Sequence, residues 1–80
     1  MDINFNKSGK IYLLNKNIQA LRVQIGRLQN YKASLNNAWS GNELVYINNS
    51  IDGVIAEMNN VINIYYGLKS DINKLNQEGV

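Results

Sequence analysis

The sequence predicts an all-α protein: an antiparallel helical hairpin of two long helices that assembles as a dimeric four-helix bundle. Three observations predict this fold. Apolar residues recur at alternating intervals of three and four in both halves of the chain, proline is absent, and a serine–glycine step separates the halves. Such spacing places the apolar side chains along one stripe of a helix, as in a coiled-coil seam. The 80 residues are expected to form a single domain.

The first helix is expected from about residue 7 to residue 39. Its stripe consists of Ile11, Leu14, Ile18, Leu21, Ile25, Leu28, Leu35 and Trp39. Only Lys32 interrupts the series, and we expect its aliphatic stem to lie in the seam with its ammonium near Asp52. A polar residue at one seam position can also set the register of a helical pair.

The chain is expected to reverse at residues 40–42. Ser40 and Glu43 have the spacing of a capping box, in which each side chain satisfies a backbone N–H group at the start of the second helix. Gly41 lies between them and provides the backbone freedom that a reversal needs. Trp39 precedes this turn at the end of the first stripe, and the pattern alone favours a packing role for it.

The second helix is expected from about residue 42 to residue 77. Its stripe consists of Leu44, Ile47, Ile51, Val54, Met58, Val61, Tyr65, Leu68, Ile72 and Leu75. It restarts out of register with the first stripe, which favours two helices over one continuous coiled coil. Ile55 and Ile62 widen it to a width typical of a helix in a bundle. The candidate dimer-interface residues are Leu13, Val23, Ile55, Ile62 and Tyr66.

Composition argues against several functional classes. Cysteine and histidine are absent, which removes disulfides, thiol chemistry and the usual zinc ligands. Carboxylates are scattered and no glycine-rich phosphate loop is present, so we expect no enzyme and no catalytic, cofactor-binding or metal site. No apolar run is long enough for a membrane span or a signal-peptide core. We therefore expect synthesis in the cytoplasm without a cleaved signal, and no membrane span.

The charge distribution is mild and does not predict a nucleic-acid partner. The formal charge is +2, and the basic residues of the first arm surround the helix instead of forming one basic stripe. They are Lys7, Lys10, Lys16, Arg22, Arg27 and Lys32. From Glu43 onward acidic residues outnumber basic ones, so a basic arm beside an acidic arm modestly favours antiparallel packing.

Two heptad-patterned arms of similar length, joined at Trp39-Ser40-Gly41, resemble the WXG family of small helical-hairpin proteins. The resemblance covers nearly the whole chain in architecture, although the motif itself has three residues. It implies a head-to-tail four-helix bundle, formed with a second copy, a related hairpin protein or the N-terminal domain of a toxin. It also implies a substrate, or a carrier of substrates, of the type VII secretion system of Gram-positive bacteria. On that view Trp39 both packs within the hairpin and is recognised by a partner.

One feature differs from the family pattern. Secreted members often carry Y-x-x-x-D/E just after the second helix, whereas here Lys69 follows Tyr65 at that spacing and Ser70 follows Tyr66. The resemblance therefore implies export beside a partner that supplies the signal, or retention in the cytoplasm as a targeting partner. The alternative hypothesis is a cytosolic coiled-coil adaptor or regulatory dimer with no link to secretion.

Overall fold

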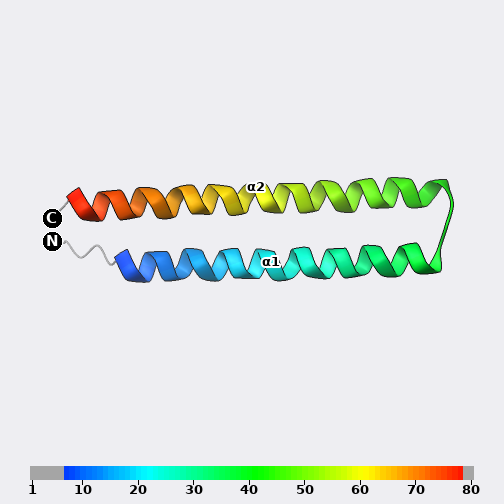
Figure 1. The fold of residues 1–80 in the computed structure, drawn as a ribbon, viewed down its shortest axis with the longest axis horizontal. Helices are drawn as coiled ribbons and strands as arrows, with labels where there is room; N and C mark the ends of the chain where they lie inside the picture. Colours follow the sequence, from blue (N-terminus) through cyan, green and yellow to red (C-terminus); the bar gives the residue numbers. More distant parts are fainter. Residues whose placement is uncertain (1–6, 79–80) are drawn as a thin grey trace.

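The computed structural model describes residues 7–78, with side chains up to residue 75. Helix α1 spans Lys7–Ala38 and helix α2 spans Asn42–Glu78. The helices run antiparallel, side by side, and residues 39–41 connect them at one end (Figure 1). All regular structure within residues 7–78 is helical. The predicted all-α hairpin is therefore confirmed.

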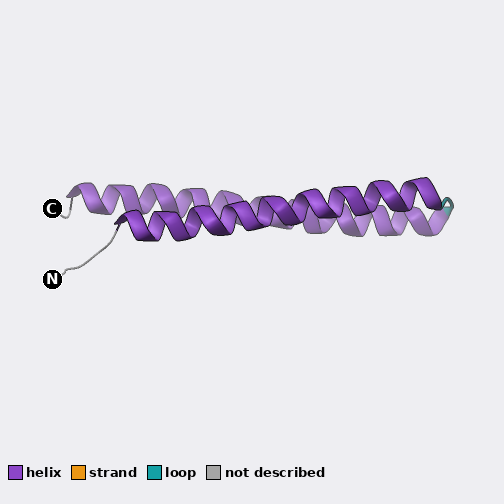
Figure 2. Cartoon of the chain, turned by 90° about the horizontal axis from the view of Figure 1, so that it is seen from below, coloured by secondary structure: helices purple, strands orange, loops and turns teal. Residues whose placement is uncertain are grey.

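The hairpin is long and thin. It measures 60 × 14 × 13 Å and has a radius of gyration of 18.4 Å, whereas a compact chain of this length would have about 12 Å. Figure 2 shows that the two helices cross at a shallow angle instead of lying parallel. Crossing of this kind is expected of heptad seams, because a seven-residue repeat follows a helix only if the two helices wrap around each other.

Helix α1 turns its predicted stripe toward α2. Ile18, near the middle of that stripe, is only 4% exposed. The other stripe positions within α1 are half-buried: Ile11, Leu14, Leu21, Ile25, Leu28, Lys32 and Leu35. Trp39, the last residue of the predicted series, lies beyond the end of α1 and is exposed. The inward face of α1 thus has the width of one heptad seam.

Helix α2 turns inward only part of the predicted stripe, together with the adjoining residues Ile55 and Ile62. Val54, Leu68 and Leu75 belong to the predicted stripe but are 46%, 42% and 62% exposed. Ile62, predicted to lie beside the stripe, is 4% exposed, and Ile55 is half-buried. Because α1 is the only other helix within residues 7–78, Ile62 must be covered by α1 inside the hairpin.

The inward face of α2 differs from the predicted one because α2 carries more apolar surface than one neighbouring helix can cover. Residues seven apart lie in one column along a helix, and α2 has three adjacent columns rich in apolar residues. The central column is Leu44, Ile51, Met58, Tyr65 and Ile72; the covered column is Asn48, Ile55, Ile62 and Lys69; the open column is Ile47, Val54, Val61, Leu68 and Leu75. Helix α1 packs on the first two columns and leaves much of the third in solvent.

The hydrophobic core of this hairpin is small. The buried hydrophobic residues among those described are Ile18, Leu44, Ile51 and Ile62. The surface of 5774 Å² exceeds the value of about 4,900 Å² that a compact protein of the same mass would expose. No helix within the described part of the chain is long and apolar enough to cross a membrane. Most of the apolar surface of the hairpin therefore stays partly in contact with solvent.

Candidate partner-binding surface

The connection between the helices depends on one glycine. Gly41 has φ +124°, a conformation that side-chain-bearing residues rarely adopt. Its carbonyl oxygen accepts a hydrogen bond from the Leu44 N–H at 3.2 Å, which closes the first turn of α2. Glu43 lies in that turn, where a carboxylate interacts favourably with the positive end of the helix dipole. The capping roles of Ser40 and Glu43 stay predictions.

Large apolar side chains are exposed at the same end of the molecule. Trp39 is 46% exposed, Val45 is 56% exposed and Tyr46 is 74% exposed. A polar hollow lined by residues 36–40 lies beside Trp39. Half-exposed tryptophan with an adjacent hollow is suited to contact with another protein, because indole contributes a large apolar area and a polar N–H group.

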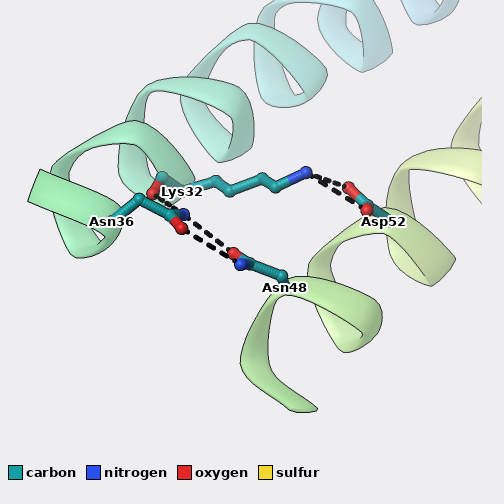
Figure 3. A network of polar contacts seen from close by, with 4 residues as sticks. All are labelled: Lys32, Asn36, Asn48 and Asp52. Atoms are coloured by element: carbon teal, nitrogen blue, oxygen red, sulfur yellow. Dashed lines mark hydrogen bonds and ion pairs between the residues drawn. The ribbon is translucent and has the colours of Figure 1, made fainter. Parts of the chain in front are cut away.

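Polar contacts join the two helices near this end (Figure 3). The ammonium of Lys32 lies 2.8 Å from one carboxylate oxygen of Asp52 and 3.1 Å from the other. This is the pairing that the sequence predicts. The side-chain amides of Asn36 and Asn48 donate to each other at 2.9 and 3.1 Å, and Asn36 also donates to the Lys32 carbonyl oxygen at 2.7 Å.

Further contacts continue the same line toward the other end. The Arg22 guanidinium donates to the Tyr66 hydroxyl oxygen at 2.6 Å and lies 6.0 Å from the ring centroid. The Lys69 ammonium lies 5.3 Å from that centroid and donates to the Asn15 side-chain oxygen at 2.7 Å. Asn15, Arg22 and Asn36 are spaced by multiples of seven, so these pairs lie on one side of the hairpin, here called the polar side.

The opposite side, here called the open side, is apolar. A shallow groove there is lined by Leu21 of α1 and by Val54, Met58 and Val61 of α2, together with Ser50, Gly53 and Glu57. Val54 and Val61 belong to the open column. The two sides therefore differ in kind: polar pairs between the helices line the first, and the second exposes a row of branched side chains.

The predicted dimer-interface residues do not form one surface in the hairpin. Leu13 and Val23 are 60% and 48% exposed and lie on the face of α1 turned away from α2. Tyr66 is 44% exposed and contacts Arg22 on the polar side. Ile55 and Ile62 face α1. Their roles in a dimer stay predictions, but Ile62 already packs within the hairpin.

Sequence reasoning missed the open column as a surface. The heptad pattern places its residues in the intramolecular seam, because they alternate with the central column at intervals of three and four. The available signal was the simultaneous presence of Ile55 and Ile62, which shows that α2 has two possible seams and one helix to cover them. Sequence reasoning also missed the exposure of Val45 and Tyr46, which lie outside both seams.

Comparisons with known proteins add no relative whose role could be transferred. No protein-family model, no curated protein and no solved structure matches the chain. Within the described residues there is no group of three or more acidic, histidine or cysteine side chains that could hold a metal ion. The features available for a functional assignment are thus the exposed apolar end around Trp39 and the open side.

Proposed function

We propose that this chain is a non-enzymatic partner-binding protein of a type VII secretion pathway. It is either a small exported substrate or the targeting partner of a larger effector. The observation that carries the proposal is the half-exposed Trp39 in the short connection between two long antiparallel helices. Exposure of a large aromatic side chain at a W-x-G connection suits recognition by a partner or by the secretion machinery.

The binding state in this proposal is a four-helix bundle. A hairpin with a small core and an apolar open side has the surface that a second pair of helices covers in such bundles. The partner is a second copy, a related helical hairpin or the N-terminal domain of a toxin. Neither a nucleic acid nor a cofactor takes part.

A cytosolic adaptor or regulatory dimer is the second candidate, and Tyr66 favours it. Arg22 of α1 donates a hydrogen bond to this tyrosine of α2, so Tyr66 already has a role in holding the helices together. Lys69 and Ser70 also stand where an export motif would have an acidic residue. In this alternative the chain stays in the cell, and Trp39 only covers the end of the hairpin.

An immunoblot of cell and medium fractions distinguishes the two candidates. The tagged protein is expressed in a host with its type VII motor either intact or deleted, and a cytosolic protein serves as the lysis control. Motor-dependent appearance in the medium is the result expected of an exported substrate or a co-exported partner. For a retained targeting partner, the expected result is that an effector appears in the medium only when both the motor and this chain are present.

Trp39→Ala is the informative variant in the same experiment, with Tyr46→Ala as its matched control. Both residues are exposed aromatic side chains at the connection end. Trp39→Ala is expected to abolish export while leaving helicity unchanged, and Tyr46→Ala is expected to leave both unchanged. Equal export of the two variants would refute a recognition role for Trp39. If the protein and every effector encoded by a neighbouring gene stay inside the cells of both strains, the result would favour the adaptor.

A further inference from the structure

Ionisable side chains are distributed unevenly along the length of the hairpin. Residues 28–57 form the half that contains the connection, and their only basic residue is Lys32. Their acidic residues are Glu43, Asp52 and Glu57. All other lysine and arginine residues lie in the opposite half. The connection end of the molecule is therefore acidic.

The end of α1 adds to this negative charge. The carbonyl oxygens of Asn36, Asn37 and Ala38 accept no hydrogen bond from a backbone N–H group within residues 7–78. Helix α1 also has no basic residue in its last turn. Carbonyl groups at the carboxyl end of a helix have a partial negative charge, which helices commonly offset with a cation or a capping backbone N–H group. This end of α1 is thus suited to a cation.

The hollow beside the connection brings these carbonyl groups and an aromatic ring together. It is lined by residues 36–40, and Trp39 among them is 46% exposed. The face of an indole ring attracts cations, especially guanidinium groups. The Glu43 carboxylate lies beside Gly41, since a Cβ added to this glycine would be 3.6 Å from Glu43 Oε1. A cation in the hollow would therefore have the carbonyl groups, the indole ring and a carboxylate near it.

The hairpin has no basic side chain of its own to place there. Lys32 is the nearest along α1, and its ammonium is 2.8 and 3.1 Å from the two carboxylate oxygens of Asp52. Arg27 precedes Asn36 by nine residues, or about 13.5 Å along the helix axis, which is farther than an arginine side chain extends. The cation must come from another molecule.

We propose that the hollow binds the guanidinium group of an arginine presented by a partner protein. This inference rests on the recognition role of Trp39 in the proposed function, and it names the chemistry of the group that is recognised. A planar guanidinium can stack on the indole ring while its N–H groups donate to the carbonyl oxygens of α1. The ammonium group of lysine is compact and strongly hydrated, so it is less suited to stacking. An apolar side chain would leave the carbonyl groups unpaired, and a carboxylate would be repelled.

Heteronuclear NMR of the full chain tests this inference directly. Trp39 is the only tryptophan, so its indole N–H group gives a single signal. The probes are N-acetyl-arginine amide and N-acetyl-citrulline amide, which have the same shape but differ in charge. The arginine probe should shift the indole signal and the backbone amide signals of residues 36–40 until they saturate. Its affinity should exceed that of the citrulline probe by at least about fivefold, because citrulline has no charge to interact with the helix end or the ring.

Two glutamate variants show whether the arginine binds in the hollow. Glu43→Gln removes the carboxylate beside the connection and should weaken binding of the arginine probe by about threefold, as expected for an exposed charge pair. Glu57→Gln removes an equal charge from an exposed position of the same helix and should leave the affinity unchanged. In Trp39→Leu the amide signals of residues 36–40 should lose most of their saturable shift, while circular dichroism shows unchanged helicity.

Three results would overturn the inference. Equal affinity for the arginine and citrulline probes would mean that charge has no part in binding. Equal affinity for N-acetyl-lysine amide would remove the assignment to a guanidinium. Equal weakening by both glutamate variants would indicate general attraction by the acidic half instead of a site.

The inference and the proposed function can fail separately. If no arginine probe binds but Trp39→Ala still abolishes export, the inference is wrong and Trp39 recognises another group. If the arginine probe binds as expected but no motor-dependent export occurs, the site belongs to the cytosolic adaptor.

Discussion

At the scale of single residues, Gly41 has a conformation that only glycine adopts without strain. Its φ is +124°, while a Cβ added there would meet only the Glu43 carboxylate at an ordinary 3.6 Å. Gly41→Ala should therefore destabilise the hairpin by roughly 1–3 kcal/mol through backbone strain and not through crowding. Thermal unfolding followed by circular dichroism measures the change.

Gly67→Ala provides the matched control for that experiment. Gly67 lies within α2 and has nothing within 4 Å of an added Cβ. Alanine there should stabilise the protein by about 0.5–1 kcal/mol, because glycine loses more backbone entropy in a helix. Opposite signs for the two substitutions are expected. A loss of stability for Gly67→Ala would mean that this position has a neighbour in the assembled protein.

The Lys32–Asp52 pair should contribute more to the pairing register of the two helices than to the free energy of unfolding. The Lys32 and Asp52 side chains are 34% and 55% exposed, so water screens their attraction. A double-mutant cycle with Lys32→Ala and Asp52→Ala should give a coupling energy below about 1 kcal/mol, and high salt should reduce it further. A coupling of several kcal/mol that salt does not change would instead indicate that another chain covers the pair.

Some residue contacts could be predicted from the sequence and others could not. Lys32 interrupts an otherwise apolar series, and Asp52 lies at the matching level of the second arm, so antiparallel pairing alone brings them together. The Arg22–Tyr66 and Asn36–Asn48 contacts also require the correct rotation of α2 about its axis. That rotation depends on the sum of several weak polar contacts, which heptad spacing does not reveal.

At the scale of helices, the all-α hairpin follows directly from the two heptad series, but the inward face of α2 does not. Helix α1 has one seam of apolar residues, and its burial agrees with the predicted stripe. On α2 the central column has an apolar column on one side and a partly polar column on the other, and either of these flanking columns could face α1. The covered column contains Asn48 and Lys69, which pair with polar side chains of α1. Those pairs favour the covered column over the more uniformly apolar open column.

Ile62→Ala tests which seam of α2 holds the hairpin together. Ile62 is 4% exposed, so its truncation should cost about 2 kcal/mol, near the lower limit for a buried isoleucine because the surrounding core is thin. Val45→Ala in the same helix, at a position 56% exposed, should change stability by less than about 0.5 kcal/mol. Equal, small effects in chemical denaturation would show that Ile62 does not face α1 in solution.

At the scale of the whole molecule, length and thinness limit the stability of the hairpin. Two helices can cover only one side of each other. The buried hydrophobic residues among those described are therefore only Ile18 of α1, Leu44 and Ile51 of the central column, and Ile62 of the covered column. Small domains have little apolar burial to offset the entropy of folding, and association is one common way to add to it. Asparagine is abundant and is a poor helix former, which makes packing still more important.

Thermal stability should consequently depend on protein concentration. If the folded state is a dimer, tenfold dilution costs about 1.4 kcal/mol and should lower Tm by roughly 3–5 °C. Val54→Asp should remove this dependence and lower Tm, because Val54 is 46% exposed in the hairpin but would be covered in the dimer. Asn63→Asp, also exposed on α2 but on its far side, should keep the wild-type dependence. A wild-type Tm that stays constant over a hundredfold range, about 2.7 kcal/mol of mass action, would mean that the hairpin is stable alone and that its open side is free for a different partner.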